Sequence, residues 1–242
     1  MRLAKIIFIT GTDTGVGKTV LTGLLLHHLR EKGVRALAMK PFCSGSRRDV
    51  KLLKALQNNE LTDEEINPYY FKEPVAPLVA ARKHRQIILL ESVLRKIRDL
   101  QKRCDLLLIE GAGGLLAPLG ERFTNKDIIS KTNCAVLVVG RNRLGTINHT
   151  LLTVKAIQGI SHQWVRIVLM NGRFTDDSAG TNGGILQELV CETPVFAVPF
   201  IGVNASQSTA IKKHAKKVKN LVQPFRSLII SPRSFECGLK SG

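Results

Sequence analysis

The sequence predicts an α/β fold: a single doubly wound, mostly parallel sheet with helices on both faces. Three observations predict it. Short apolar runs alternate with segments of helical period along the 242 residues, as expected where crossover helices connect buried parallel strands. Polar and glycine-rich stretches follow the apolar runs. The first of these stretches, Gly11–Thr19, has the composition of a phosphate-binding loop.

The first strand is the apolar run Ile6–Ile9, and it leads into Gly11-Thr12-Asp13-Thr14-Gly15-Val16-Gly17-Lys18-Thr19. A helix follows, because valine and leucines recur with helical spacing from residue 20 to residue 29. Backbone N–H groups in such a turn point at an anion. Lys18 can reach the outer phosphates of a nucleotide, and the Thr19 hydroxyl can ligate Mg²⁺.

One position departs from the common form of this loop. The first glycine is expected at Thr12 and stands one residue earlier, at Gly11. A glycine-rich turn that binds nothing is the alternative, but the strand and the helix on either side favour a phosphate site.

Composition narrows the class of protein. The chain has 44% apolar residues and five cysteines. No apolar run approaches the roughly 20 residues needed to cross a bilayer, and the N-terminus lacks the apolar stretch of a signal peptide. The scattered cysteines contain no Cys-x-x-Cys pair, which argues against a disulfide framework and a zinc site. We therefore expect a cytoplasmic protein.

The formal net charge of +17 raises the question of an anionic partner, either nucleic acid or membrane. Lysines and arginines are spread along the chain, and only Lys212–Lys219 is a dense run. Its helical spacing favours the solvated face of a helix. We therefore expect neither a nucleic-acid partner nor a membrane.

The second strand, Val34–Met39, ends in the loop Lys40–Gly45. Ligands bind at the carboxyl edge of open parallel sheets, so Lys40 is a candidate contact for phosphate or carboxylate. Asp49 follows shortly and opens a helix.

The chain before the third strand is predicted to hold a loop and two helices. Asn58–Lys72 is polar and loop-like, with a turn at Asn67–Tyr70. A short helix is expected over Leu78–Arg82. Glu91–Lys102 is amphipathic, with apolar residues at spacings of three and four, and should cover the sheet.

The third strand, Asp105–Ile109, ends in Glu110-Gly111-Ala112-Gly113-Gly114. An acidic residue that closes an apolar strand beside a phosphate loop is placed to hold Mg²⁺. The glycines after it allow a ligand to approach the backbone closely.

Three further strands complete the predicted sheet, and each is followed by a polar segment and a helix. The strands are Ala135–Val139, Val165–Met170 and Pro194–Val198. The helices reach Ile157 and Val190, and the last one is the basic segment Thr209–Val222. The final twenty residues are expected to be irregular apart from Leu228–Ile230. The sequence has no internal repeat and no domain boundary, so residues 1–242 are expected to form one domain.

Taken in order, these motifs resemble those of the dethiobiotin synthetase family. The resemblance covers about residues 5–202. It rests on the phosphate loop, on Lys40-Pro41 with Ser44-Gly45, on Glu110–Gly114 and on Leu144-Gly145-Thr146-Ile147-Asn148-His149. The segment 209–242 has no counterpart in it and no assigned role.

The resemblance implies a reaction. Family members close a ureido ring on 7,8-diaminopelargonic acid with CO₂ and ATP. One amine takes up CO₂ as a carbamate, whose oxygen attacks the γ-phosphate to give a carbamic-phosphoric anhydride. The second amine then attacks the carbonyl and expels phosphate. The protein contributes positioning and charge stabilisation.

The resemblance also implies roles for individual residues. Lys40 and Lys18 correspond to the catalytic residues, at the carbamate and at the phosphates. The Mg²⁺ ligands correspond to Thr19, Asp49 and Glu110. The nucleotide contacts correspond to Gly15, Val16, Gly17, Lys18, Thr19, Asp49, Glu110, Gly111, Ala112, Gly113, Asn171, Gly172, Pro199, Phe200 and Ile201. The substrate contacts correspond to Thr14, Ser44, Leu144, Gly145 and Asn148, the last three from the partner subunit of a homodimer.

The sequence leaves two other functions open. One is another ATP-dependent amide ligase of the same fold group, although the chain has no room for a glutaminase domain. The other is a partition ATPase of the ParA kind, which binds DNA or membrane through basic residues. Those proteins carry an extra lysine early in the phosphate loop, where this chain has Thr12-Asp13-Thr14. DNA or anionic lipid should stimulate the ATPase activity of a partition protein, whereas diaminopelargonic acid with bicarbonate should stimulate a synthetase.

Overall fold

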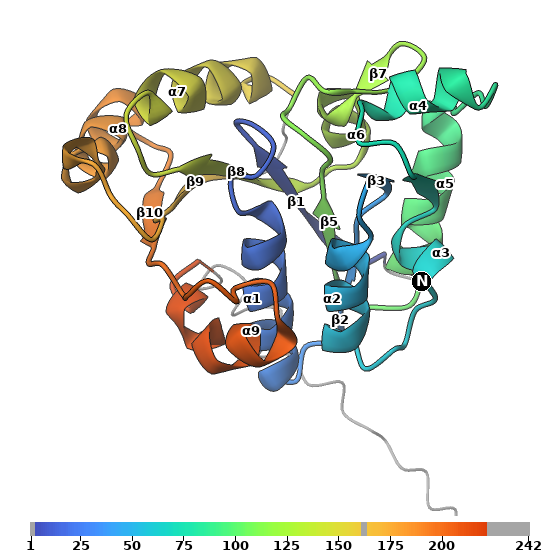
Figure 1. Ribbon diagram of the computed structural model, residues 1–242, viewed down its shortest axis with the longest axis horizontal. Coiled ribbons are helices and arrows are strands. Elements are labelled where there is room, and N and C mark those ends of the chain that lie inside the picture. Colours follow the sequence, from blue (N-terminus) through green and yellow to red (C-terminus); the bar gives the residue numbers. More distant parts are fainter. Residues whose placement is uncertain (1–2, 161–163, 222–242) are drawn as a thin grey trace, which may run out of the picture.

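The computed structural model describes residues 3–160 and 164–221. Its centre is a six-stranded sheet in which every neighbouring pair is parallel (Figure 1). This confirms the predicted α/β class. In spatial order the strands are β10 (Val195–Val198), β9 (Val165–Met170), β8 (Ala135–Arg141), β1 (Lys5–Gly11), β5 (Leu106–Glu110) and β2 (Ala36–Met39).

Strand β1 lies in the middle of this sheet, between β5 and β8. Ile7 pairs with Leu108 of β5 and with Ala135 of β8. All three residues are buried, because helices cover both faces of the sheet. The apolar runs of the sequence therefore become its central strands, and the loop after β1 is held between two other strand ends.

The order of the strands reverses at β1. The chain passes from β1 toward β2 at one edge, and later from β5 through β8 and β9 to β10 at the other edge. Right-handed crossovers in opposite directions place the connecting helices on opposite faces. Ligands of such sheets bind where the order reverses, outside the carboxyl ends of the strands.

The helices fall into two groups in Figure 1. Helix α1 (Lys18–Glu31) packs against α2 (Arg48–Leu56) and α9 (Ser208–His214) in the lower half of the view. The other group holds α5 (Leu90–Gln101), which contacts α6 (Asn125–Lys131), and α7 (Thr146–Ile157), which contacts α8 (Asn182–Val190). Val93, Ile97 and Leu100 are the buried residues of α5, as its amphipathic pattern predicts.

The region predicted as loop and turn, Asn58–Lys72, is more ordered than expected. It contains α3 (Asp63–Ile66), which Thr62 and Glu65 begin with a capping box, and β4 (Tyr69–Phe71). Strand β4 pairs with β3 (Phe42–Ser44) in a separate two-stranded sheet. The predicted turn at Asn67–Tyr70 is therefore wrong. Tyr69 is drawn into a strand because its ring stacks on Phe42, with ring centroids 4.9 Å apart.

Several small elements complete the fold. They are α4 (Pro77–Lys83), the antiparallel pair β6 (Pro118–Gly120) and β7 (Phe123–Thr124), and a 3₁₀ turn at Asp177–Gly180. The sequence analysis did not predict the β6–β7 pair or α6. Two- and three-residue strands are too short to show a period.

The basic helix predicted over Thr209–Val222 is not continuous. Helix α9 ends at His214, and a 3₁₀ turn continues over Ala215–Val218. Four apolar side chains of this segment are buried against the rest of the protein, whereas its lysines are exposed, as expected for the solvated face of a helix. The buried residues are Ile211, Ala215, Val218 and Leu221. Val222 and Leu228–Ile230 lie outside the described residues.

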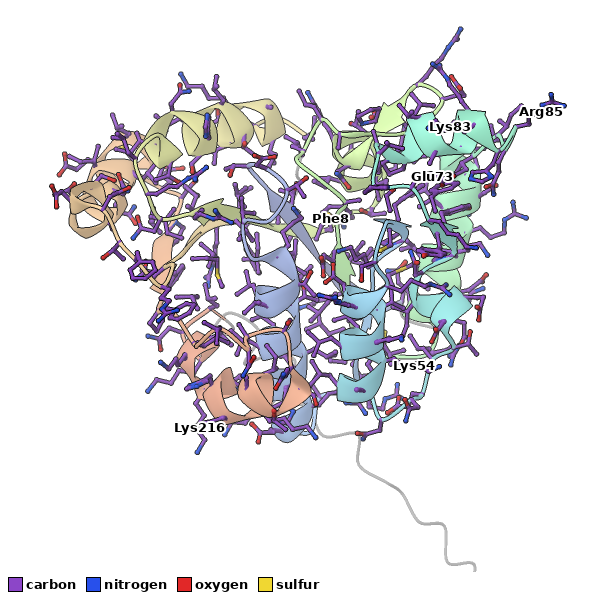
Figure 2. All side chains as sticks on the ribbon, in the orientation of Figure 1. Phe8, Lys54, Glu73, Lys83, Arg85 and Lys216 are labelled. Carbon is purple, nitrogen blue, oxygen red and sulfur yellow. The ribbon has the colours of Figure 1, made fainter. Side chains whose placement is uncertain are left out.

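The positive charge is distributed over the molecule. Figure 2 shows Lys83 and Arg85 at the upper right and Lys216 at the lower left, with Lys54 on a different side again. Within residues 3–160 and 164–221, no helix is long and apolar enough to cross a bilayer. Among the described residues, Cys43, Cys104 and Cys191 are free thiols and Cys134 is buried, whereas Cys237 lies outside the described residues.

Candidate active site

The loop between β1 and α1 has the backbone shape that its glycines predict. Gly15 and Gly17 have φ values of +71° and +105°, in the left-handed region that favours glycine. Gly11 is required for another reason. A Cβ there would lie 2.8 Å from Val16 Cγ2 and 3.0 Å from Lys18 Nζ. The displaced first glycine of the motif therefore makes room for the lysine.

Lys18 begins α1, and its side chain turns back over the loop. Its Nζ donates a hydrogen bond to the Asp13 carbonyl, at 2.8 Å. Burial disfavours the ammonium and lowers the pKa of Lys18 to about 8, although the negative charge of Glu110 opposes the shift. A phosphate oxygen could replace the Asp13 carbonyl and would favour the charged form.

Four side chains, from three elements and one loop, meet beside this lysine, and we call them the charged cluster. They are Thr19 of α1, Lys40 after β2, Asp49 of α2 and Glu110 of β5. Lys40 Nζ donates to Glu110 Oε1 at 2.8 Å and also to Asp49 Oδ2. Thr19 Oγ1 donates to the same Glu110 oxygen at 2.6 Å. Lys40 and Glu110 are buried.

Burial acts against the charge of Lys40, but its two carboxylate neighbours outweigh it. The charges of Glu110 and Asp49, with their hydrogen bonds, hold the pKa of Lys40 above its ordinary value. The second carboxylate oxygen of Glu110, Oε2, is buried and has no hydrogen-bond partner among the described residues. An unsatisfied buried carboxylate oxygen is costly, so this atom is available to a cation or a donor.

The loop that carries Lys40 is fixed by hydrogen bonds to the end of α3 and to strand β4. The backbone N–H of Lys40 donates to the Ile66 carbonyl, and Asn67 Nδ2 donates to the Lys40 carbonyl, each at 2.9 Å. The Tyr70 hydroxyl donates to the Gly45 carbonyl. Within the described residues Ser44 Oγ is buried and has no partner, so its hydroxyl is free to bind a ligand.

The glycine-rich turn after β5 packs on the phosphate loop. A Cβ at Gly113 would lie 3.8 Å from Thr14 Oγ1, and a Cβ at Gly114 would lie 3.4 Å from the Thr12 carbonyl. Asn125 Nδ2 fixes the turn by donating to the carbonyls of Ala112 and Gly114. The predicted nucleotide contacts Gly111, Ala112 and Gly113 thus lie beside the loop.

A cavity of about 650 Å³ lies on the other side of the phosphate loop, outside the ends of β8, β9 and β10. It is lined by predicted nucleotide contacts, namely Gly15, Val16, Gly17, Asn171, Gly172, Pro199, Phe200 and Ile201. The sequence analysis missed Arg141 and Asn142, which also line it. The sequence did contain a signal for them, since both residues stand at the carboxyl end of a buried strand, where ligands bind. Arg141 Nη2 donates to the Gly15 carbonyl at 2.8 Å.

Three predicted substrate contacts lie apart from the charged cluster. Gly145, with φ +89°, caps the N-terminus of α7. Leu144 is 80% exposed, and Asn148 is also exposed. Within the described residues, none of the three shares a hydrogen bond with the charged cluster.

A phosphate loop, a carboxylate that ends the neighbouring strand and a cavity where the strand order reverses define a nucleotide-binding protein of the P-loop class. Residues 5–203 match the family model described as an AAA domain. The chain is 35% identical over 211 residues to the ATP-dependent dethiobiotin synthetase BioD of Bacillus subtilis, covering 84% of this chain and 90% of that protein. It is 41% identical over 162 residues to the protein of that name from Nitrosospira multiformis, covering 65% and 72%. The chain belongs to the ATP-dependent dethiobiotin synthetase family, as its motifs predict.

Solved structures of other proteins share the fold. The pNOB8 ParA bound to nonspecific DNA superposes with a TM-score of 0.55 at 13% identity, covering 92% of this chain and 99% of that one. The septum site-determining protein MinD from Pyrococcus horikoshii, complexed with Mg-ADP, gives 0.55 at 14% identity, covering 95% and 100%. At this identity the likeness establishes the fold alone. The family match therefore favours the synthetase over the partition ATPase.

Proposed function

We propose that this protein forms dethiobiotin by closing a ureido ring on 7,8-diaminopelargonic acid with CO₂ and ATP, releasing ADP and phosphate. The charged cluster is the observation that carries this proposal. It holds a buried cation, Lys40, between two carboxylates, and it includes the phosphate-loop residue Thr19. In the dethiobiotin synthetase family, the corresponding lysine lies where the carbamate meets the γ-phosphate.

ATP is proposed to lie across the phosphate loop. The backbone from Gly15 to Thr19 and the Lys18 ammonium hold its phosphates. The cavity outside β8, β9 and β10 accepts its base and ribose, with Asn171 and the segment Pro199–Ile201 at the base.

Thr19, Asp49 and Glu110 are proposed to hold Mg²⁺. Their donors are oxygens, which suit this ion, and Glu110 Oε2, which has no hydrogen-bond partner among the described residues, fits a cation. When bound, the ion neutralises charge on the β- and γ-phosphates.

Lys40 is proposed to stabilise charge at the reacting atoms, and Lys18 to stabilise it at the phosphates. One substrate amine bonds to CO₂ and loses a proton, which gives a carbamate. A carbamate oxygen then bonds to the γ-phosphorus as the bond to ADP breaks. The second amine attacks the carbonyl carbon, loses a proton and expels phosphate. In each phosphoryl and acyl step negative charge moves between oxygens that a fixed ammonium can face.

The diamine is proposed to bind between Thr14 and Ser44, with its carboxylate tail held by Leu144, Gly145 and Asn148 of a partner subunit. The exposure of Leu144 supports a homodimer. Leu144→Asp should shift the sedimentation coefficient from dimer to monomer. Ile87→Asp, at a residue that is 76% exposed elsewhere, is the control and should not. A wild-type monomer at assay concentration would contradict the dimer.

We also propose a cytoplasmic location, which the free thiols support.

The reaction is tested by phosphate release from ATP, with Mg²⁺ and bicarbonate, in the presence and absence of the diamine. Release should depend on the diamine, and mass spectrometry should find a product heavier by one carbonyl less two hydrogens. Release that DNA or anionic vesicles stimulate and the diamine does not would reject the synthetase and support the partition ATPase.

A further inference from the structure

Three asparagines form a chain of side-chain hydrogen bonds in the wall of the cavity, where Asn142 and Asn171 line it. Asn142 follows β8, Asn171 follows β9 and Asn182 begins α8. Backbone bonds from Asn142 N to the Met170 carbonyl and from Asn171 N to the Val198 carbonyl place the first two on adjacent strand ends. Asn142 and Asn182 are 5% and 2% exposed. None of the established or proposed roles uses Asn142 or Asn182.

The hydrogen bonds of this chain have a fixed direction. Asn182 Nδ2 donates to Asn142 Oδ1 at 3.0 Å, and it also lies within hydrogen-bond distance of Ser178 Oγ, at 3.1 Å, and of the Arg143 carbonyl, at 3.2 Å. Asn142 Nδ2 donates to the Ala179 carbonyl at 3.0 Å and to Asn171 Oδ1 at 2.8 Å. Backbone carbonyls only accept hydrogen bonds. The two carbonyls therefore dictate which end of each amide faces the next.

The direction of the chain decides what Asn171 presents to the cavity. Its Oδ1 is turned inward by Asn142, so its Nδ2 is the end that faces away from the network. Within the described residues, Asn171 Nδ2 donates no hydrogen bond, and Asn171 lines the cavity. Turning the amide over would set two NH₂ groups against each other, because Asn142 Nδ2 is held by the Ala179 carbonyl.

We propose that Asn142 and Asn182 are positioning residues for nucleobase selection. They hold Asn171 as a hydrogen-bond donor toward the base, so the site selects a purine ring nitrogen, which is an acceptor. This inference rests on the proposed contact between Asn171 and the base. A freely rotating asparagine offers a donor or an acceptor equally well, whereas a locked one discriminates between them.

The test is calorimetric binding of ATP and of three analogues in which C–H replaces ring nitrogen 1, 3 or 7, without the diamine. In the wild type, one analogue should bind about three- to tenfold more weakly than ATP, the loss of one neutral hydrogen bond. Asn142→Ala should weaken ATP binding by about the same factor and abolish the difference between ATP and that analogue. Equal binding of ATP and all analogues by the wild type would overturn the proposal.

A double-mutant cycle separates positioning from a general structural effect. If Asn142 acts through Asn171, then Asn142→Ala adds less than about twofold to the ATP dissociation constant in an Asn171→Ala background. Effects that multiply would overturn the proposal. Gln57→Ala is the matched control, because the Gln57 amide is also buried and bonds the Ala38 backbone, away from the cavity. It should lower stability and leave the preference for ATP over the analogue unchanged.

A second variant covers the case in which Asn142→Ala does not fold. Asn171→Asp keeps the inward oxygen that accepts from Asn142 and replaces only the outward NH₂ by an acceptor. It should bind ATP more weakly than Asn171→Ala does, because two acceptors then face each other. ATP binding as tight as in the wild type would overturn the proposal. None of these measurements needs ring closure, so a failure of the proposed reaction and a failure of this inference are distinguished.

Discussion

The two sides of the phosphate loop are built from opposite chemistry. On the side of β2 and β5, the charged cluster buries an ammonium between two carboxylates. On the side of β8 and β9, neutral amides meet in a chain of fixed direction. A charged group attracts any opposite charge within several ångströms, whatever the direction, so it still interacts when one charged partner replaces another. An amide contributes only along its N–H or C=O direction. The first side suits moving charge in a reaction, and the second suits reading the edge of a base.

The strongest test of this contrast removes the central cation. Lys40→Met should lower the turnover of diamine-dependent phosphate release about 10²–10³-fold, because a fixed charge at the reacting oxygens is lost. The free energy of unfolding in urea should fall by about 3–5 kcal/mol, because Glu110 is left buried without its partner. The dissociation constant of ATP should change less than about threefold, since the amide side is untouched.

Lys54→Met is the matched control for Lys40→Met. Lys54 also bonds a carboxylate, Asp63, at 2.7 Å, but its side chain is 34% exposed. Turnover should stay near wild type, and the free energy of unfolding should fall by no more than about 1 kcal/mol. Equal losses of turnover and of unfolding free energy in both variants would contradict the view that burial makes the Lys40 ion pairs different from that of Lys54.

The pH dependence of ATP binding tests Lys18. Its pKa in the free protein is about 8, and phosphate favours its charged form, so bound ATP raises that pKa. Affinity should be constant below pH 8 and should weaken above it, by up to about tenfold per pH unit. Lys40, whose pKa lies above its ordinary value, stays charged in this range. Calorimetry from pH 7 to 9.5 should detect proton uptake on binding above pH 8, and a flat profile would contradict the assignment.

A smaller effect is expected at the proposed magnesium ligand on α2. Asp49→Asn should raise the Mg²⁺ concentration for half-maximal activity about tenfold, because the amide lacks the negative charge with which a carboxylate oxygen attracts this ion. Asp63→Asn, which also removes a lysine-paired carboxylate, should leave it unchanged. An identical Mg²⁺ requirement in wild type and Asp49→Asn would place the ligand elsewhere.

The smallest effect is expected at the diamine. Ser44→Ala should raise its KM about three- to tenfold, the cost of one hydrogen bond. It should not lower the free energy of unfolding, because the Ser44 hydroxyl is buried and has no hydrogen-bond partner in the part of the chain that the structure describes. Ser46→Ala, in the same loop but exposed, is the control. An unchanged KM would leave the Ser44 hydroxyl without a role in binding the diamine.

The sequence predicts the large elements well and the small ones poorly. The six strands of the main sheet are apolar runs, because both faces of a central parallel sheet are covered. Strands β3 and β4 have three residues each, too few to show a period, and form because Phe42 and Tyr69 stack across them. The break between α9 and the 3₁₀ turn at Ala215 is likewise a matter of packing on α1.

The same division applies to the site. The phosphate-loop motif and the residues that close each strand determined, without any structure, which side chains gather at one edge of the sheet, since parallel strands end together. Only the tertiary structure decided that Lys40 bridges Asp49 and Glu110, and that Asn142 and Asn182 orient Asn171. These contacts join residues 9 to 70 positions apart. The directions of these hydrogen bonds depend on which backbone carbonyls the packing of the chain brings within reach. A local sequence pattern does not predict which carbonyls those are.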